Sequence, residues 1–209
     1  MTRGRLGKSA LALAGLLAAA GCASGGAAAG TYHPSGSSVS SAGAYPGEPT
    51  TGVHVNVSLA DRKLYVRNGT QTVQSYSIGV GKPGYETPEG DYSVRRIVWN
   101  PPWNPPDEAW ADDKDPQPPG APENPMKVVK IYFKEPDYYI HGTGTLSSLG
   151  GAVSHGCLRM APEDAASLAR YLMDAGGAGR DAAWFANVQK SNETQTIVLS
   201  SSIPMHVAN

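Results

Sequence analysis

A proline-rich stretch in the middle of the chain, residues 100–125, places the strongest limit on the fold. Nine of these residues are proline, which lacks a backbone donor and breaks helices and central strands. We therefore expect a long loop inside an otherwise regular domain, and such loops are usually functional or mobile. The 209-residue chain contains 25 glycines and 17 prolines, about a fifth of the total, which favours a loop-rich β protein over a helical bundle.

Three tryptophans accompany this loop, namely Trp99, Trp103 and Trp110. Aromatic side chains in a proline-rich loop can stack on a sugar or cover a peptide groove. They can equally pin a long loop to the sheet beneath it, and the sequence does not decide between these two roles. A polyproline ligand for a partner domain is a third interpretation, which the interruptions of the proline run disfavour.

The first 21 residues have the pattern of an export signal. They begin with three basic residues, Arg3, Arg5 and Lys8. The apolar run at residues 9–20 is short for a transmembrane helix. Ala20-Gly21-Cys22 matches the end of a bacterial lipoprotein signal, in which Cys22 is lipidated and becomes the new N-terminus, although leucine is more common than Ala19 at the preceding position. The alternative is ordinary cleavage after Ala20.

A composition change divides the rest of the chain into a tether and one domain. Residues 22–51 are rich in Ala, Gly and Ser and show no periodicity, which is typical of a flexible tether. Regular alternation begins at Val53, and we expect a single folded domain over residues 52–209. His54 lies between two valines of the first strand, so it is expected on the solvent side of that strand.

The remaining patterns predict a mainly β domain with one or two helices. Strands are expected at residues 53–57, 64–66, 72–80, 92–98, 126–133, 138–140, 196–199 and 203–207. Asn68-Gly69 predicts a hairpin turn. A helix is predicted over residues 162–174 with Gly176-Gly177 as its end, and a shorter one over residues 181–187. Leucines at helical spacing predict that the first helix packs against the sheet.

The stretch at residues 140–160 holds the side chains most suited to catalysis. It contains His141, His155 and Cys157, with five glycines in 21 positions. A thiol, imidazoles and a glycine-rich backbone are the parts of a cysteine nucleophile with its base and oxyanion site. Gly156 allows a sharp turn that presents backbone N–H groups near the thiol. Local spacing does not identify the base, because His155 lies two residues from Cys157 and His141 lies 16 residues away.

Other roles for these side chains are less consistent with the sequence. A lone cysteine is usually a small buried hydrophobe and a lone histidine is usually structural, but the two histidines lie in one loop with Cys157, Ser154 and Arg159. Zinc binding lacks a fourth ligand at a familiar spacing and a CxxC pair, so no metal and no cofactor are predicted. A disulfide with Cys22 is not expected, since lipidation would block it.

Charge gives no indication of a nucleic-acid partner. The chain has 17 basic and 18 acidic residues, so it carries no strong basic field that would attract phosphates. We therefore expect no nucleic acid among its partners.

Two motifs in the 140–160 stretch resemble a known family. His141-Gly142-Thr143 followed by Ser154-His155-Gly156-Cys157-Leu158-Arg159-Met160 is similar to the signature of the L,D-transpeptidase catalytic domain, the YkuD family. Flanking pieces resemble that family or its periplasmic ErfK/YbiS-like branch, namely residues 79–81 with 87–90, 99–101, 123–125 and 203–205. The resemblance covers about residues 52–209. Arg159 occupies a position that is asparagine in some members.

The resemblance implies a mixed β-sandwich-like fold with a catalytic cysteine. It assigns Cys157 as the nucleophile and His141 as the general base, with the backbone carbonyl of Gly142 orienting the imidazole ring. The choice between the two histidines therefore comes from the resemblance and not from their spacing.

The same resemblance implies supporting roles for the neighbouring residues. His155 and Gly156 would supply site geometry and backbone oxyanion donors. Ser154, Thr143 and Arg159 would bind the substrate, with Ser154 and Arg159 positioning either the loop or a substrate carboxylate. Arg159 could instead be a structural salt-bridge partner.

The implied reaction is acyl transfer on peptidoglycan stem peptides. Cys157 would attack the carbonyl of the third, diamino-acid residue and expel the terminal D-Ala, leaving a thioester. An amine of another stem would attack the thioester and form a 3→3 cross-link, whereas an amine of a protein would attach that protein to the wall. With water as the acceptor, the enzyme would be an L,D-carboxypeptidase. We expect an exported protein of the periplasm or cell envelope, anchored to the membrane through Cys22.

Two alternatives from other classes share parts of this pattern. A non-catalytic wall-binding lipoprotein would keep the fold, but it would have no need of both Cys157 and His141. An exported cysteine peptidase acting on proteins would share the nucleophile but not the flanking motifs.

Overall fold

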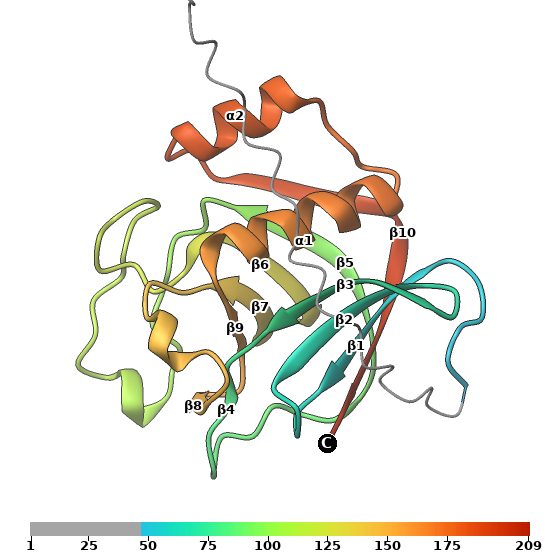
Figure 1. The fold of residues 1–209 in the computed structure, drawn as a ribbon. Helices are drawn as coiled ribbons and strands as arrows, with labels where there is room; N and C mark the ends of the chain where they lie inside the picture. Colours follow the sequence, from blue (N-terminus) through green and yellow to red (C-terminus); the bar gives the residue numbers. More distant parts are fainter. Residues whose placement is uncertain (1–46) are drawn as a thin grey trace, which may run out of the picture. The chain divides into compact units, whose positions relative to one another are not determined.

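The structure is a computed structural model that describes residues 47–209 (Figure 1). The expected signal peptide (residues 1–21), Cys22 and the tether up to residue 46 lie outside the described residues. The strands are β1 (Val53–Ser58), β2 (Lys63–Asn68), β3 (Gln71–Ser77), β4 (Val80–Gly81), β5 (Gly90–Trp99), β6 (Lys127–Lys134), β7 (Tyr138–Gly142), β8 (Ala152–Ser154), β9 (Leu158–Met160) and β10 (Gln195–Ala208). The helices are α1 (Pro162–Ala175) and α2 (Ala182–Lys190), with short 3₁₀ turns at Ala109–Ala111 and Leu146–Ser148. Neither α-helix in this part of the chain is long and apolar enough to cross a membrane.

Eight of these strands form one mixed sheet in the order β3-β2-β1-β10-β5-β6-β7-β9, and β4 pairs with β8 beside it. Most neighbours are antiparallel, but β1 runs parallel to β10 and β7 runs parallel to β9. Parallel neighbours need a crossover connection, and the segment between β7 and β9 carries the predicted site. The expected mainly β, sandwich-like fold with two helices and a long proline-rich loop is confirmed.

The last strand, β10, joins the two halves of the sheet. Its C-terminal part pairs with β1 on one side, and β5 follows it along most of the other side. The sequence predicts two strands here, at residues 196–199 and 203–207, whereas the structure has one long strand whose register shifts between Val198 and Ile203. A bulge absorbs the extra residues without ending the pairing.

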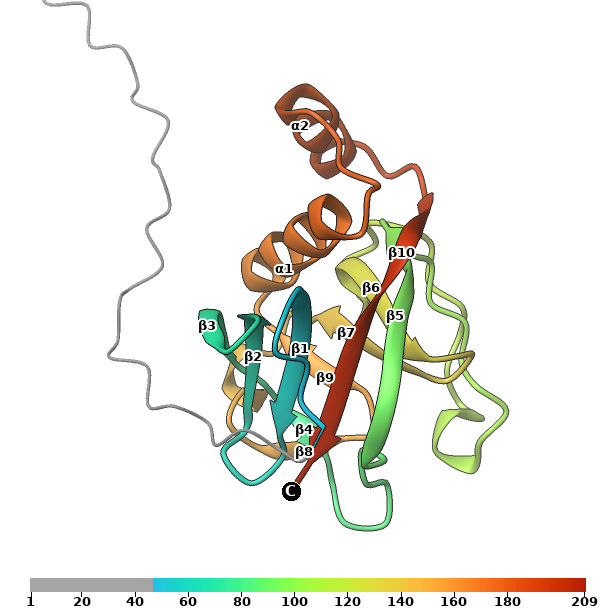
Figure 2. The same cartoon turned by 90° about the vertical axis from the view of Figure 1, so that its right-hand side faces the viewer.

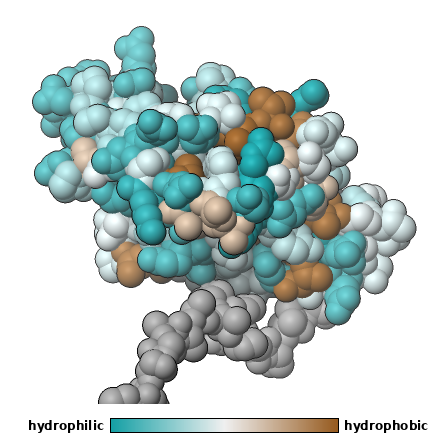
Figure 3. Space-filling view, turned by 90° about the horizontal axis from the view of Figure 1, so that it is seen from above, coloured by the Kyte–Doolittle hydropathy of each residue, from teal (hydrophilic) through white to brown (hydrophobic). Residues whose placement is uncertain are grey.

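α1 packs against β6 and β7, and α2 lies beyond α1 at the end of the molecule (Figure 2). α1 begins at Pro162, a residue favoured in a first helical turn, and buries Leu168, Leu172 and Met173 completely. α2 is capped by the Asp181 carboxylate, which accepts a hydrogen bond from the N–H of Trp184 at 2.8 Å. Seen from the top of Figure 1, the end at which α2 lies, the surface is mostly hydrophilic with scattered apolar residues (Figure 3).

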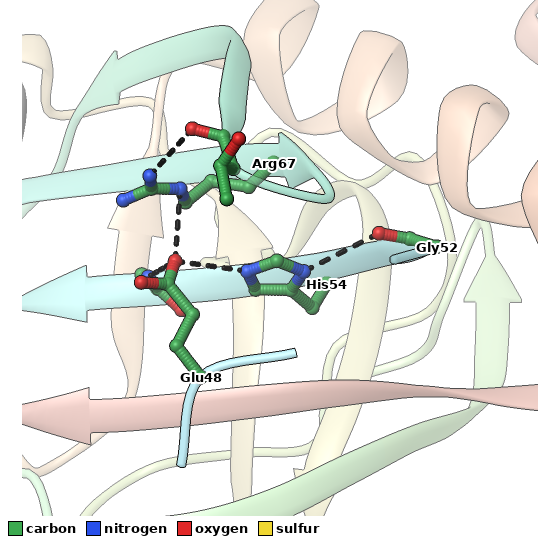
Figure 4. A network of polar contacts seen from close by, with 6 residues as sticks. Glu48, Gly52, His54 and Arg67 are labelled. Carbon is green, nitrogen blue, oxygen red and sulfur yellow. Dashed lines mark hydrogen bonds and ion pairs between the residues drawn. The ribbon is translucent and has the colours of Figure 1, made fainter. Parts of the chain in front are cut away.

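The expected exposure of His54 is wrong. Its side chain is fully buried, because the segment before β1 folds over the outer side of that strand. Glu48 Oε1 lies 3.1 Å from Nε2 of His54, 3.0 Å from Nδ2 of Asn56 and 2.9 Å from Nε of Arg67 (Figure 4). β1 is therefore buried on both faces, although its sequence alternates. Glu48, which the sequence places in the tether, packs against the domain.

The proline-rich loop is held by its own polar groups and by buried aromatic rings. Asn124, 1% exposed, donates to the carbonyls of Pro101 and Pro118, both at 3.0 Å, and accepts from the N–H of Met126 at 2.8 Å. Trp103 is buried and exchanges two backbone hydrogen bonds with Gln117. In Figure 1 the loop, in yellow-green, lies on the side of the molecule where β7, β8 and β9 are found.

Candidate active site

The parallel pairing of β7 with β9 brings the predicted base and nucleophile to one face of the sheet. Ile140 pairs with Leu158 and His141 pairs with Arg159. Side chains alternate along a strand, so buried Ile140 and Leu158 face the core while His141 and Arg159 share the opposite face. Cys157, two residues before Arg159, belongs to that same face, which we call the cleft face.

His141 is buried and its tautomer is set by the backbone. Nδ1 lies 2.8 Å from the carbonyl oxygen of Gly142, and because a carbonyl can only accept, Nδ1 carries the hydrogen. Nε2 is therefore the basic nitrogen. Burial lowers the pKa of His141 to about 4; hydrogen bonds to the backbone of Gly142 and Pro125 oppose this shift, and the charges of Arg159 and Lys130 add to it. At neutral pH the ring is an uncharged acceptor.

Cys157 is a half-buried free thiol that donates to the carbonyl oxygen of Asp137, with Sγ and the oxygen 3.4 Å apart. Burial raises the pKa of the thiol to about 11, against hydrogen bonds from Tyr139 and the charges of Lys130 and Arg159. The substrate-free site thus holds a neutral thiol and a neutral imidazole in the lining of one cleft, a combination suited to general-base activation at the moment of attack.

His155 occupies a different environment from His141. Its Nε2 lies 2.9 Å from Nζ of Lys82, and since an ammonium can only donate, this nitrogen is an acceptor already in use. Trp110 stacks on the ring with centroids 3.9 Å apart and planes 4° from parallel, and Tyr85 meets its edge at 4.7 Å. Burial, then Lys82 and Arg159, lower the pKa of His155. His155 anchors the proline-rich loop to the turn that carries Cys157.

The turn before Cys157 is organised by hydroxyl groups. Ser154 Oγ donates to the carbonyl of Cys157 at 2.6 Å and accepts from the N–H of Gly156 at 3.1 Å. This N–H, expected as an oxyanion donor, is therefore engaged within the turn. Gly156 has φ +105°, and a Cβ there would lie 2.7 Å from the Tyr138 ring, so only glycine fits without strain. Thr87 Oγ1 donates to the Gly156 carbonyl at 2.8 Å.

These residues line an open cleft with a volume of about 1460 Å³. His141, Cys157 and Arg159 lie in its wall together with Trp110, Tyr85 and Lys130. A cleft of this size has room for an extended peptide with attached groups. No group of three His, Cys, Asp or Glu side chains suited to a metal ion occurs within residues 47–209.

Comparison with known proteins adds the identity of the fold. The sequence matches the YkuD family, described as the L,D-transpeptidase catalytic domain, over residues 52–193. The chain belongs to this family. The resemblance predicted from the His141 and Cys157 motifs is thereby confirmed.

Two relatives of this L,D-transpeptidase domain are enterobacterial proteins. The probable L,D-transpeptidase YbiS of Escherichia coli K12 is 36% identical over 120 residues, covering 54% of this chain and 39% of YbiS. The probable L,D-transpeptidase ErfK/SrfK of Salmonella typhimurium is 35% identical over 130 residues, covering 59% of this chain and 40% of ErfK/SrfK. The matched region thus spans about two fifths of the length of these curated relatives.

Solved structures of L,D-transpeptidases align with the domain at low sequence identity. An enzyme from Mycobacterium smegmatis superimposes with a TM-score of 0.48 and 16% identity, covering 75% of this chain and 58% of that one. L,D-transpeptidase 3 from Mycobacterium tuberculosis gives a TM-score of 0.48 and 17% identity, covering 75% and 61%.

The structure places the other predicted site residues of this L,D-transpeptidase domain around the cleft. Thr143 is buried in the cleft wall and its Oγ1 accepts from the N–H of Thr145 at 3.2 Å. Arg159 is half-buried, and its backbone exchanges two hydrogen bonds with Gly79 at 2.9 and 2.8 Å. The GVG segment at residues 79–81 therefore supports the strand that follows Cys157.

Sequence reasoning missed Lys130, a residue of β6 that is only 8% exposed. It lies opposite His141 in the β6–β7 register and lines the cleft. The alternating pattern of β6 does indicate its position, since Val129, Ile131 and Phe133 face the core and leave Lys130 on the cleft face. Identifying it required the pairing of β6 with β7, which local pattern does not contain.

Proposed function

We propose that this chain is an L,D-transpeptidase that acts on peptidoglycan stem peptides through a cysteine acyl-enzyme. The observation that carries the proposal is the tautomer of His141, whose Nδ1 donates to the Gly142 carbonyl and leaves Nε2 basic on the face that also holds Cys157. His155 is less suited to this role, because its Nε2 already accepts from Lys82.

The first half-reaction forms a thioester. Sγ of Cys157 attacks the carbonyl carbon of the third, diamino-acid residue while Nε2 of His141 takes the thiol proton. The tetrahedral intermediate collapses with cleavage of the C–N bond, and His141 returns that proton to the departing amine of D-Ala.

The second half-reaction transfers the acyl group. The amine of another stem attacks the thioester, its proton passes to His141, and the C–S bond breaks to restore the Cys157 thiol. This yields a 3→3 cross-link, and an amine of a protein would instead attach that protein to the wall. With water as acceptor the same site would be an L,D-carboxypeptidase.

The setting of the reaction follows from the N-terminal sequence. We propose that residues 1–21 direct export, that Cys22 is lipidated and anchors the protein in the cell envelope, and that residues 22–51 tether a catalytic domain at residues 52–209. Globomycin, which blocks lipoprotein signal cleavage, tests the anchor. Accumulation of an unprocessed precursor is expected, and unchanged processing would exclude lipidation at Cys22.

The enzyme proposal is tested with disaccharide-tetrapeptide. Purified protein should release D-Ala and form cross-linked dimer or tripeptide, both detected by mass spectrometry. Cys157→Ala and His141→Asn should each lower the rate at least about 1,000-fold, while His206→Asn, a histidine change away from the cleft lining, should not. Absence of product from the wild type would overturn the proposal, and so would activity that survives Cys157→Ala.

A further inference from the structure

Lys130 is a mostly buried lysine that lines the open cleft. Its side chain lies on the cleft face of β6 and is 8% exposed. Within residues 47–209 no carboxylate forms an ion pair with it, and its Nζ lies over the Tyr139 ring, 4.6 Å from the centroid. The fold supplies no carboxylate to this ammonium, so an anion that arrives with a ligand would provide the counter-charge.

Arg159 adds a second unpaired cation to the same wall. Its Nε is buried and has no hydrogen-bond partner among the described residues. Arg159 pairs with His141 in the β7–β9 register, and His141 also pairs with Lys130 across β6. The two cations therefore flank the base from opposite sides, and both act electrostatically on the Cys157 thiol.

The neighbouring Arg96, by contrast, is a cation of this sheet that has a carboxylate partner. It donates two hydrogen bonds to the Glu135 carboxylate, both at 2.9 Å, and its guanidinium lies over the Tyr132 ring at 3.7 Å. Acidic residues also line the cleft, including Glu86, Glu108 and Asp137, but none pairs with Lys130 or Arg159 in the described part of the chain. The two unpaired cations are thus a local feature of the wall beside the nucleophile.

We propose that Lys130 and Arg159 form a carboxylate site that binds the free α-carboxylate of the residue expelled from the stem peptide. This inference rests on the proposed function and names the substrate feature that the site recognises. The leaving residue carries its carboxylate one residue beyond the scissile carbonyl, within about 4 Å along the chain. The distal carboxylate of the diamino acid lies several bonds further away, so it matches a site beside Cys157 less well.

The site would make the enzyme specific for a chain end. A free terminal carboxylate satisfies both cations, whereas an amidated end or a continuing peptide leaves them without a counter-charge, which a site built for an anion rejects strongly. Cleavage would then be limited to the last peptide bond of the stem. The acceptor amine of a diamino acid also has a carboxylate on the same carbon, so the emptied site can hold it during the second half-reaction.

The experiment compares two donors, disaccharide-tetrapeptide with a free C-terminal carboxylate and the same compound with a C-terminal amide. We expect the wild type to prefer the acid at least about tenfold in kcat/KM. Lys130→Met should lose most of that preference through a higher KM for the acid, with little change for the amide. Lys130→Arg should restore the preference, and Lys134→Met, on the same strand but outside the cleft lining, should keep it.

A second role for Lys130, stabilising the thiolate, predicts a different result. In that case Lys130→Met would slow both donors equally and shift the pH profile of Cys157 alkylation by iodoacetamide. Equal loss on both donors, or a wild type that does not distinguish acid from amide, would overturn the proposal. The wild-type comparison decides the question even if Lys130→Met fails to fold.

A binding assay separates this inference from the proposed function. N-acetyl-D-alanine should protect Cys157 from iodoacetamide in the wild type, and N-acetyl-D-alaninamide should not. Protection without any turnover of tetrapeptide would support the carboxylate site and overturn the transpeptidase proposal. Turnover of tetrapeptide without selective protection and without preference for the acid would support the transpeptidase proposal and overturn the carboxylate site.

Discussion

Nδ1 of His141 donates to the carbonyl oxygen of Gly142, the next residue in the chain, across 2.8 Å. This hydrogen bond ties the ring orientation to the backbone of β7 and leaves Nε2 as the acceptor on the cleft face. Burial lowers the pKa of the imidazole to about 4 and raises that of the Cys157 thiol to about 11. The pair is therefore uncharged before substrate binds, and two measurements follow from that state.

Alkylation of Cys157 should show no thiolate at neutral pH. In the substrate-free enzyme the iodoacetamide rate, followed by peptide mass spectrometry, should rise about tenfold per pH unit between pH 6 and 9, because only the thiolate reacts. His141→Asn should leave that profile almost unchanged, since a neutral ring does not stabilise a thiolate. A plateau near pH 7 that His141→Asn removes would instead demonstrate a thiolate–imidazolium pair.

The same burial makes the domain sensitive to acid. The unfolded chain binds a proton at His141 near pH 6.5, whereas the folded chain does so only near pH 4, so stability is lost as pH falls between these values. We expect the free energy of unfolding to drop by about 2–3 kcal/mol more in the wild type than in His141→Gln between pH 7 and pH 4.5. Urea unfolding at both pH values measures this, and equal losses in the two proteins would contradict it.

The SHGC turn should depend on one buried hydroxyl outside it. Thr87 Oγ1 donates to the Gly156 carbonyl at 2.8 Å and accepts from the Gly81 N–H at 3.0 Å. Thr87→Val leaves both groups buried without a partner, so we expect a loss of about 2 kcal/mol and a melting temperature lower by roughly 4–8 °C. Thr87→Ser keeps the hydroxyl and serves as the control, and equal melting temperatures for the two variants would refute the role of this bond.

Trp110 should control the titration of His155. Its stacked ring contributes to the burial that, with Lys82 and Arg159, lowers the pKa of His155. Trp110→Ala should raise that pKa toward its ordinary value, which NMR titration of the ring protons measures. Lys82→Met should act in the same direction by removing a positive charge. A His155 titration curve that neither substitution moves would show that the loop does not shape this site.

Local sequence patterns predict those elements whose structure is determined by residues close together in the chain. The Asn68-Gly69 hairpin and the helix from Pro162 to Gly176 follow from turn chemistry and capping, which involve residues a few positions apart. The motifs around His141 and Cys157 likewise identified the family.

Long-range pairing accounts for what the sequence did not reveal. His54 was expected in solvent because nothing near it in the strand pattern indicates that Glu48 folds back over β1. Lys130 was overlooked because its place beside His141 depends on the register between β6 and β7. The engagement of the Gly156 N–H by Ser154 depends on a turn geometry that residue identities alone do not specify.

The Glu48 carboxylate fixes the start of the domain through hydrogen bonds with His54 and Asn56 and an ion pair with Arg67. Burial alone would raise its pKa, but the hydrogen bonds from His54 and Asn56 and the charge of Arg67 outweigh burial and lower it. A carboxyl group with a lowered folded pKa stabilises the protein above its unfolded pKa of about 4.5 and loses that effect as pH falls further. The network should therefore stabilise the fold at neutral pH and fade in acid.

Glu48→Gln tests this network, because it removes the charge while keeping the shape of the side chain. Breaking a buried ion pair from one side costs about 3 kcal/mol, so we expect a melting temperature lower by roughly 6–12 °C at pH 7. The difference from the wild type should shrink at pH 3.5, because the stabilisation from a lowered carboxyl pKa is lost as pH falls below the unfolded value of about 4.5. Glu89→Gln, at an exposed position, should melt with the wild type at both pH values. A gap of the same size at pH 7 and pH 3.5 would show that the Glu48 side chain acts through packing and not through its charge.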